Sequence, residues 1–388
     1  MGEGRKAPFI LVGAGQAAAR AADALRRQGY EGRIVMFGEE PHQPYQRPPL
    51  SKKFLTGDVL APQLWLQGDG YFEQNGIELF TDARVTAVDP RHSTVMLADG
   101  SNHVYDRLLL ATGSIARPLP VPGASCSGVY YLRTMADTLR LRGVCEAGHN
   151  VVIIGGGYIG LEVAASVRSI GKSVTVVEGQ ERLLKRVVSP VVSAFFLDLH
   201  RRNGVDVRLG ATVARIVGDT AVTGVELTGG EAIAADLVLV AIGGAANDEL
   251  AREARLACDD GVLVDETCHA GYGIYAAGDC ARFPSRRYGR LVRLESVQNA
   301  NDQGRAAAQA MLGKPTSYDP IPWFWSDQFD VKLQIAGLSQ GYDRTTQEGD
   351  PAKGAFCVSY WQGERLLATD SINAPRSHME ARRALART

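Results

Sequence analysis

Residues 151–178, VVIIGGGYIGLEVAASVRSIGKSVTVVE, have the pattern of a strand, a tight turn, a helix and a second strand. The first four residues form a continuous β-branched run, which is typical of a strand buried on both faces. Gly155, Gly157 and Gly160 follow with G-x-G-x-x-G spacing. In such a turn the first glycine permits the bend, the second lets backbone N–H groups approach a pyrophosphate, and the third allows close contact between helix and strand. The stretch therefore predicts a dinucleotide-binding unit.

The second strand of this unit, residues 173–177, leads directly into Glu178. A carboxylate in this position can bind a ribose 2′-hydroxyl and repels a 2′-phosphate, so the sequence favours NADH over NADPH. Arg182, Lys185 and Arg186 follow closely. They could either attract a phosphate or form a solvated basic face, and the residues alone leave both readings open.

A related turn lies near the N-terminus. A short apolar strand, residues 9–12, precedes Gly13 and Gly15 in a G-x-G-x-x-A pattern. The turn opens a helix that we expect to run to about Arg27. The sequence therefore predicts two dinucleotide cradles in one chain.

Acidic residues follow two of the other predicted strands. Glu39 and Glu40 come after the strand at residues 33–37, and we expect Glu39 to bind a ribose, with Glu40 as its rival. Either could instead be a solvated turn residue. Asp279 ends the apolar strand at residues 274–277, where it could accept a hydrogen bond from a ribityl or phosphate-adjacent hydroxyl. The alternative for Asp279 is a turn or cap residue.

Residues 44–52, PYQRPPLSK, contain three prolines. Prolines stiffen the backbone, and we expect them to exclude a helix before Leu50. The segment would then present Lys52 from a rigid platform. A surface loop with an exposed lysine is the alternative, and the residues alone do not decide between the two.

A buried strand that ends in a small-residue turn occurs twice, and a proline-rich crossing separates the two copies. Residues 108–113, LLLATG, end at Thr112 and Gly113, and residues 237–243, LVLVAIG, end at Gly243. This repeat predicts two similar halves, one inserted in the other. The expected segments are residues 1–115 and 245–320 for the first dinucleotide-binding domain, 116–244 for the second, which we expect to bind NADH, and 321–388 for a C-terminal domain.

From residue 321 onward the composition changes. Residues 322–325, PWFW, bring three aromatic side chains together, and Trp323 and Trp325 share one face if the segment is extended. Without other context we interpret these rings as core packing. The antiparallel strands expected after them are residues 331–335, 356–360 and 365–368.

Composition limits the function classes. A chain of 388 residues exceeds the usual single core, and its formal net charge of -1 gives no general preference for nucleic acid. No run reaches the roughly 20 apolar residues of a membrane span. Local charged patches remain possible, but we expect neither nucleic acid nor a membrane as a partner.

Arg5 and Lys6 precede an apolar run at residues 7–19 that resembles a signal peptide. Gly13 and Gly15 argue against this interpretation, because they stand at the end of a strand. Six scattered cysteines without a C-x-x-C pair argue against a disulfide scaffold, and seven separated histidines give no reason to expect a metal site. We expect a reduced, cytoplasmic setting.

The chain resembles the FAD-dependent, NADH-using ferredoxin reductases of oxygenase systems, the putidaredoxin reductase type, from about residue 9 to residue 373. This resemblance implies an α/β protein with two Rossmann-like domains in a glutathione-reductase-like architecture and a C-terminal α+β domain. Family members usually continue beyond the position of Thr388. The motifs that carry the resemblance are YQRPPLSK (45–52), VVIIGGGYIGLEVAA (151–165), AAGDCARF (276–283), LESVQNA (294–300) and PWFWSDQ (322–328).

The resemblance also implies roles for individual residues. It places Lys52 and Glu162 as a pair beside the flavin ring, and Trp325 as the aromatic near the isoalloxazine. The implied FAD contacts are Gly13, Gly15, Ala17, Glu39, Lys52, Val85, Thr112, Gly113, Arg133, Asp279 and Val297. The implied NADH contacts are Gly155, Gly157, Tyr158, Ile159, Gly160, Glu178 and Gly243.

The expected function is transfer of a hydride from NADH to FAD and of single electrons to a 2Fe-2S ferredoxin that feeds a cytochrome P450 or a Rieske oxygenase. Four arginines near the predicted flavin-facing helix could form a docking patch for an acidic ferredoxin, or they could simply be a solvated charged surface. One alternative is an NADH-responsive sensing flavoprotein of the apoptosis-inducing-factor kind. Another, a disulfide or peroxide reductase, would need a reactive cysteine near Lys52. The docking candidates are Arg286, Arg287, Arg290 and Arg305.

Overall fold

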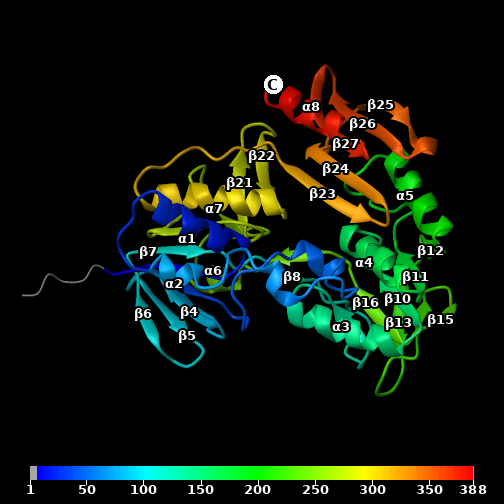
Figure 1. Ribbon diagram of the computed structural model, residues 1–388, viewed down its shortest axis with the longest axis horizontal. Coiled ribbons are helices and arrows are strands. Elements are labelled where there is room, and N and C mark those ends of the chain that lie inside the picture. Colours follow the sequence, from blue (N-terminus) through cyan, green and yellow to red (C-terminus); the bar gives the residue numbers. More distant parts are fainter. Residues whose placement is uncertain (1–6, 388) are drawn as a thin grey trace, which may run out of the picture. The chain divides into compact units, whose positions relative to one another are not determined.

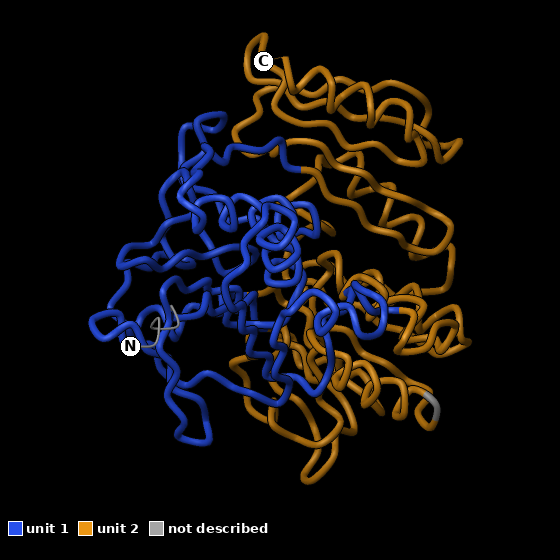
Figure 2. Tube along the Cα trace, turned by 60° about the vertical axis from the view of Figure 1, so that its left-hand side comes forward, with its two compact units in different colours: residues 1–46, 64–115, 245–322 blue, residues 47–63, 116–244, 323–388 orange. Residues whose placement is uncertain are grey.

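The structure, a computed structural model, describes residues 7–387 and divides into two units (Figure 2). Arg5 and Lys6 lie outside the described residues. Unit 1 comprises residues 1–46, 64–115 and 245–322, and unit 2 comprises residues 47–63, 116–244 and 323–388. Two of the crossings between the units lie in short strands, β8 (Ser114–Ala116) and β17 (Gly244–Ala246), and the others follow residues 46, 63 and 322.

Unit 1 is built on a six-stranded sheet. Its β1 strand pairs in parallel with β2 and β7, and β7 pairs in parallel with β20, so the carboxyl ends of these four strands meet at one edge. The sheet order is β19 (His269–Gly271), β20 (Ile274–Ala276), β7 (Arg107–Leu110), β1 (Phe9–Val12), β2 (Ile34–Phe37) and β3 (Ile77–Phe80).

Helices α1 and α7 lie side by side in unit 1 (Figure 1). A Cβ added at Gly304 of α7 would lie 2.5 Å from the carbonyl oxygen of Ala17 in α1, so only glycine permits this close packing. The helices are α1 (Gln16–Arg27), α2 (Tyr71–Gln74), α6 (Glu249–Glu253) and α7 (Val297–Met311). The small sheets are β4 (Val85–Asp89), β5 (Thr94–Leu97) and β6 (Asn102–Val104), and β18 (Val262–Leu263), β21 (Ala281–Ser285) and β22 (Arg290–Arg293).

The central part of unit 2 contains a five-stranded sheet in which every pair of neighbouring strands is parallel. Apolar residues between it and a three-stranded antiparallel sheet form a buried core. The parallel sheet is β12 (Asp206–Leu209), β11 (Ser173–Glu178), β10 (Asn150–Ile154), β16 (Leu237–Val240) and β9 (Val129–Tyr131). The other elements are α3 (Met135–Ala147), α4 (Tyr158–Ser169), α5 (Pro190–Arg202), β13 (Val213–Val217), β14 (Gly224–Leu227) and β15 (Ala232–Ala234).

The C-terminal part of unit 2 is a five-stranded antiparallel sheet with helix α8 packed on β24 and β27. The three predicted strands are confirmed as β24, β26 and β27. Strand β25 forms one edge, and all of its residues are exposed. The order is β23 (Trp323–Gln328), β24 (Val331–Gly337), β27 (Arg365–Ile372), β26 (Ala355–Gln362) and β25 (Arg344–Asp350), and α8 spans Pro375–Leu385.

The aromatic residues of β23 occupy a half-buried surface. The rings of Trp323 and Trp325 stack with their centroids 5.8 Å apart, which confirms that they share one strand face. Both side chains are only partly buried, and Arg382 lies over the Trp323 ring. The interpretation of these rings as core packing is therefore wrong.

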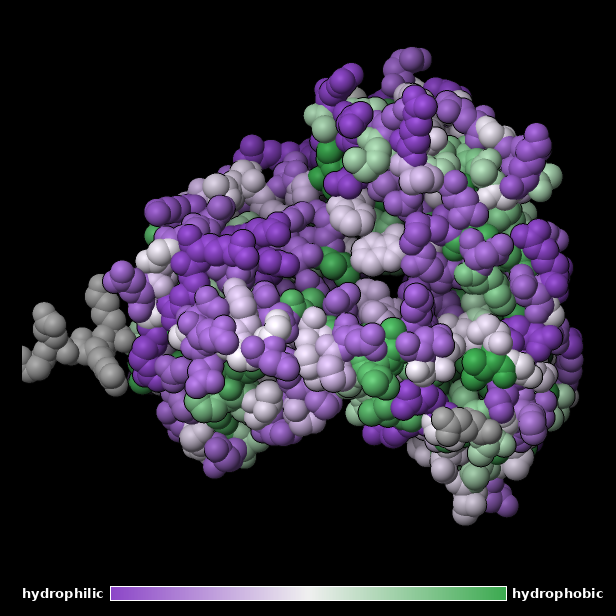
Figure 3. Space-filling view, viewed as in Figure 1, coloured by the Kyte–Doolittle hydropathy of each residue, from purple (hydrophilic) through white to green (hydrophobic). Residues whose placement is uncertain are grey.

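The predicted fold class, two Rossmann-like units with a C-terminal α+β part, is confirmed. The predicted domain limits stay predictions. On the face drawn in Figure 3, hydrophilic residues predominate and hydrophobic residues form small separate groups. Within residues 7–387, no helix is long and apolar enough to cross a membrane.

Strand β27 buries a carboxyl group, that of Asp370. The Tyr360 hydroxyl donates a hydrogen bond to it, and the Ser189 backbone N–H donates to the Tyr360 oxygen at 2.7 Å. Burial raises the pKa of Asp370 from 3.8 to about 7. The folded chain therefore retains this proton where the unfolded chain has lost it, and the stability that results disappears as the pH rises through about 7.

We expect Asp370→Asn to raise the melting temperature relative to the wild type at pH 8, by at least about 2 °C. Asparagine still accepts the Tyr360 hydrogen bond but cannot ionise, so the difference should shrink toward pH 5. Differential scanning fluorimetry across this pH range measures it. Asp327→Asn, on the exposed side of the same sheet, is the matched control. A gain that does not grow with pH would contradict the prediction.

Candidate active site

The glycine turn after β10 has the shape that a dinucleotide requires. Gly155 has a φ of +114°, and a Cβ there would lie 2.4 Å from the carbonyl oxygen of Ala241. A Cβ at Gly160 would lie 2.1 Å from the carbonyl oxygen of Gly155, so helix and strand pack too closely for a side chain. A Cβ at Gly157 would have no described atom within 4 Å. The first and third glycines thus serve packing, whereas the second borders open space.

Helix α4 begins at this turn, with Gly157 as its N-cap and no side chain that caps it. The positive end of the helix dipole and free N–H groups are available to an anion. Tyr158 and Ile159 form the first turn: Tyr158 is half-buried with its hydroxyl oxygen enclosed, and Ile159 is half exposed. These residues fit a pyrophosphate of NAD(P)H at the turn.

Glu178 lies against the same turn. Its carboxylate accepts hydrogen bonds from the backbone N–H of Gly156 at 2.7 Å and from that of Gln180 at 2.8 Å. Gly243, at the end of the neighbouring strand, has a φ of +110°. The acid is therefore held at the carboxyl end of β11, where the sequence predicts a ribose contact.

Two of the three nearby basic residues, Arg182 and Lys185, bind to their own loop, whereas Arg186 is exposed. Arg182 donates to the carbonyl oxygens of Val188 and Lys185, at 2.8 Å and 2.9 Å. The Lys185 ammonium pairs with Glu181 at 2.6 Å. These contacts favour the solvated-face reading over a phosphate site.

Unit 1 brings several predicted FAD contacts to one sheet edge. Gly13, Thr112, Gly113 and Asp279 follow the carboxyl ends of the neighbouring parallel strands β1, β7 and β20. Gly13 repeats the geometry of the other cradle, since a Cβ there would lie 2.3 Å from the carbonyl oxygen of Ala111. The chain's residues thus form a second cradle that fits a dinucleotide such as FAD.

The other members of this cradle have distinct environments. A Cβ at Gly15 would meet nothing within 4 Å, and Ala17 is buried beneath α7. Asp279 accepts a hydrogen bond from the Ser114 hydroxyl at 3.0 Å, which supports an orienting role over a free turn residue. Val297 is the first residue of α7, and Val85 is buried in β4.

The rival acids after β2 differ in their surroundings. The Glu40 carboxylate accepts a hydrogen bond from the Tyr45 hydroxyl at 2.5 Å. Glu39 is 64% exposed and contacts Arg84 at 3.5 Å. Glu39 is therefore the more accessible acid.

Unit 2 brings Lys52 and Glu162 together, as the resemblance implies. The Lys52 ammonium lies 2.5 Å from Oε2 of Glu162, and their side chains are 18% and 7% exposed. Two hydroxyl groups also donate hydrogen bonds to the Glu162 carboxylate. Ser51 donates to Oε2 at 2.6 Å, and Ser326 donates to Oε1 at 2.7 Å. Lys52 is thus a buried partner of Glu162, and the reading as an exposed loop lysine is wrong.

The prolines before Lys52 have the opposite effect to the one predicted. Pro48 and Pro49 open a short 3₁₀ helix, Pro48–Ser51, because the fixed φ of proline suits the first positions of a helical turn. The expectation that no helix begins before Leu50 is therefore wrong. This turn packs on α4, and Ser166 of α4 donates its hydroxyl to the Ser51 carbonyl at 2.8 Å.

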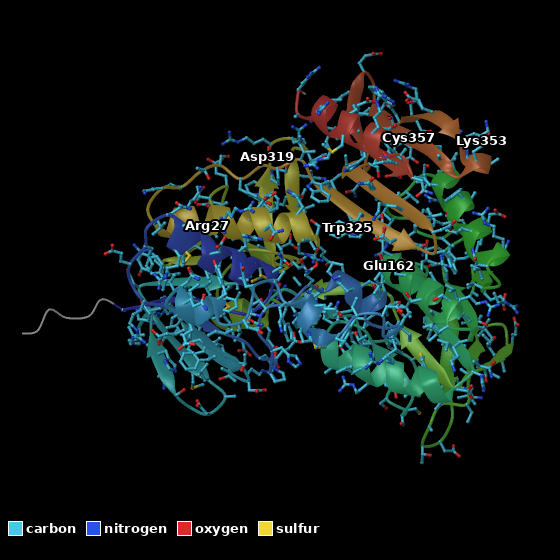
Figure 4. All side chains as sticks on the ribbon, viewed as in Figure 1. Arg27, Glu162, Asp319, Trp325, Lys353 and Cys357 are labelled. Carbon is cyan, nitrogen blue, oxygen red and sulfur yellow. The ribbon has the colours of Figure 1, made fainter. Side chains whose placement is uncertain are left out.

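The other predicted ring contacts also belong to unit 2. Trp325 lies on β23, which packs on the helix that carries Glu162 (Figure 4). Arg133 precedes α3: its N–H donates to Asp137, and its carbonyl accepts from Arg47 at 2.7 Å. The sequence did not single out Ser51 or Ser326. Alternation along an extended PWFWSDQ segment was the one signal that could have placed Ser326 opposite the tryptophans.

Comparison with known proteins agrees with this geometry. Residues 8–304 match the family described as pyridine nucleotide-disulphide oxidoreductase, and residues 323–388 match the reductase C-terminal family. The chain belongs to the pyridine nucleotide-disulphide oxidoreductase family. It is an oxidoreductase, and its cofactors are FAD and NAD(P)H.

Three similar proteins illustrate the relationship. Rhodocoxin reductase of Rhodococcus erythropolis is 43% identical over 97% of this chain and 89% of its own length. A 5,5'-dehydrodivanillate O-demethylase ferredoxin reductase subunit from a Sphingobium strain is 41% identical over 96% and 92%. The covalent putidaredoxin reductase–putidaredoxin complex matches with a TM-score of 0.94 and 40% identity, over 98% of this chain and 93% of that chain.

Three thiols of this chain do not suit the disulphide chemistry in the family's name. Burial raises the pKa of Cys258 to about 11 and that of Cys268 to about 12, and it also raises the pKa of Cys280. A thiol nucleophile must ionise, so these groups are unreactive near neutral pH. All six cysteines are free.

We expect Gly157→Ala to raise the dissociation constant for NADH at least about tenfold while the melting temperature stays unchanged. The added methyl meets no protein atom but enters the space beside the turn. Isothermal titration and scanning fluorimetry measure the two quantities. Gly143→Ala in α3, also in open space, is the control: it should leave NADH binding unchanged and raise the melting temperature slightly, because alanine suits a helix interior better than glycine. Unchanged NADH binding would contradict the assignment of this turn.

Proposed function

We propose that this protein takes electrons from NADH through FAD and passes them singly to a 2Fe-2S ferredoxin that feeds a cytochrome P450 or a Rieske oxygenase. The observation that carries this proposal is that the chain holds two glycine cradles together with a Lys52–Glu162 ion pair whose side chains are 18% and 7% exposed. The similarity to ferredoxin reductases of oxygenase systems supports it. The free cysteines support a reducing, cytoplasmic location.

Each group of residues has a distinct task in this proposal. FAD, when bound, accepts an electron pair and releases electrons one at a time. The Gly155 to Gly160 turn and Glu178 bind and orient NADH. Lys52, held by Glu162, supplies a fixed positive charge beside the flavin ring, and Trp325 covers the ring from the C-terminal sheet.

A fixed charge of this kind needs a rigid, dry environment. Glu162 accepts three hydrogen bonds or ion-pair contacts, so its carboxylate has one orientation. Lys52 also donates to the Pro48 carbonyl at 3.2 Å. Preorganised charges in a water-poor site stabilise developing charge without reorganisation, and the ion pair meets this condition.

The competing functions make different demands. A disulfide reductase needs a thiolate near the flavin, and the buried cysteines with raised pKa values argue against it. A sensing protein of the apoptosis-inducing-factor kind would reduce its flavin slowly and would not turn over with ferredoxin. The similar proteins give no support for this alternative.

The test is anaerobic stopped-flow mixing of the purified holoprotein with NADH or NADPH, followed by cytochrome c reduction with 2Fe-2S ferredoxins. We expect rapid bleaching by NADH, ferredoxin-dependent turnover, and a preference for NADH that Glu178→Gln reduces about tenfold. Glu181→Gln, three residues later and exposed, is the control. Bleaching without ferredoxin turnover would contradict the proposal, and an unchanged preference would contradict the role of Glu178.

We propose that the ferredoxin docks through the predicted arginines, with Arg290 as the main contact. Arg286 is ion-paired with Glu266, and Arg305 pairs with Asp302 at 3.1 Å, so each is already neutralised. Arg287 is half-buried and its backbone N–H donates to Asp319. Arg290 is exposed at the start of β22.

We expect Arg290→Glu to lower the ferredoxin-dependent rate about tenfold at low salt, with less effect at high salt, because surface charges steer association. Arg91→Glu makes the same charge change in the turn between β4 and β5 and is the control. The measurement is cytochrome c reduction against ionic strength. If the rate of cytochrome c reduction depended on ionic strength equally in the two variants, the docking proposal would be wrong.

A further inference from the structure

A line of buried polar side chains leads away from Glu162 through unit 2. Ser326 donates to Glu162, Gln328 donates its side-chain amide to the Ser326 oxygen at 3.2 Å, and His200 lies 2.9 Å from the Gln328 carbonyl oxygen. Ser326, Gln328 and His200 are each 0% exposed. We call these three residues the Glu162 relay.

The direction of the hydrogen bonds follows from the carboxylate. Glu162 is paired with Lys52 and can only accept, so Ser326 must donate to it and accept from Gln328. The Gln328 amide therefore points its nitrogen at Ser326 and its oxygen at His200. Nε2 of His200 must then carry the hydrogen. Burial lowers the pKa of His200 to about 4, so the ring is neutral at pH 7.

Stability alone gives no reason for this arrangement. Burying an amide and an imidazole costs free energy unless both are fully hydrogen-bonded, and apolar residues of equal size would fill the space at no such cost. Nδ1 of His200 has no hydrogen-bond partner among the described residues. Neither Gln328 nor His200 caps a helix end through these bonds. His200 also contacts the Phe329 ring, but among the described residues the hydrogen bonds of both side chains lie on the path to Glu162.

We propose that Ser326, Gln328 and His200 are positioning residues for the Lys52–Glu162 ion pair. By occupying Oε1 of Glu162, the relay leaves Oε2 to Lys52 and Ser51 and so fixes where the Lys52 ammonium stands. This proposal rests on the proposed function, because the position of that charge matters for electron transfer from NADH to the flavin.

The relay also joins three separate parts of the chain. His200 lies on α5, Gln328 and Ser326 lie on β23, and Glu162 lies on α4. Ser326 and Gln328 point to one face of β23 because side chains alternate along a strand, and Trp325 points to the other face. The same strand therefore presents an aromatic side chain on one face and orients the ion pair from the other.

The test is a double-mutant cycle with Ser326→Ala, Gln328→Met and the double variant, in the holoprotein. The first measurement is the acylation rate of Lys52 by a water-soluble ester, read by peptide mass spectrometry without NADH. We expect each single variant to be labelled roughly threefold faster or more, because Lys52 is held less firmly. The double variant should match Ser326→Ala, since Gln328 acts through Ser326.

The second measurement is flavin bleaching by NADH. We expect about a tenfold lower rate in each single variant, no further loss in the double variant, a more negative flavin midpoint potential and an unchanged NADH dissociation constant. His200→Phe, at the far end of the relay, should lower the rate less. Thr369→Val removes another buried hydroxyl contact in the same sheet and is the control for packing damage.

Two results would overturn the relay. One is Gln328→Met behaving like Thr369→Val in both measurements, and the other is additive effects in the double variant. A wild type that NADH does not bleach would refute the proposed function instead. The Lys52 labelling would still decide on the relay, because it needs no NADH.

Discussion

The exclusion of side chains from two backbone turns is the constraint on which the rest of the structure depends. At Gly13 and Gly155 the turn passes so close to the next strand that a Cβ would overlap a carbonyl oxygen, at 2.3 Å and 2.4 Å. In each turn the first glycine leaves no room for a side chain against the sheet, whereas a Cβ at the second glycine, Gly15 or Gly157, would meet no atom within 4 Å. Backbone N–H groups and a helix N-terminus then face the open side, where the phosphates of a dinucleotide can bind.

A second level of organisation depends on one buried carboxylate. Glu162 on α4 brings together the 3₁₀ helix Pro48–Ser51 and strand β23, although Ser51 and Ser326 are far apart in the sequence. A buried carboxylate without partners would be costly, so these segments must pack together for the ion pair to persist. The requirement to give this carboxylate partners therefore also orders the surrounding backbone.

The sequence predicted what short-range patterns encode. Glycine spacing, β-branched runs and alternation located both cradles, Glu178 and the C-terminal strands. It did not reveal contacts between distant segments, which is why Ser326, Gln328 and His200 went unnoticed. Proline was misjudged at Pro48 because its fixed φ opens a helical turn as readily as it blocks one. Likewise, the sequence did not show that Arg286 and Arg305 form ion pairs, with Glu266 and Asp302, which only the fold brings beside them.

Strand β25 protects the exposed edge of the C-terminal sheet against pairing with other molecules. It lies at the edge of the sheet, bonded to β26 alone, and an unpaired edge of this kind can recruit strands from other molecules. Its sequence, RTTQEGD, contains no large apolar residue and carries charges at Arg344, Glu348 and Asp350. A neighbouring copy would gain no apolar surface by pairing there and would meet buried-charge penalties. The edge thus resists aggregation while leaving the sheet open to water.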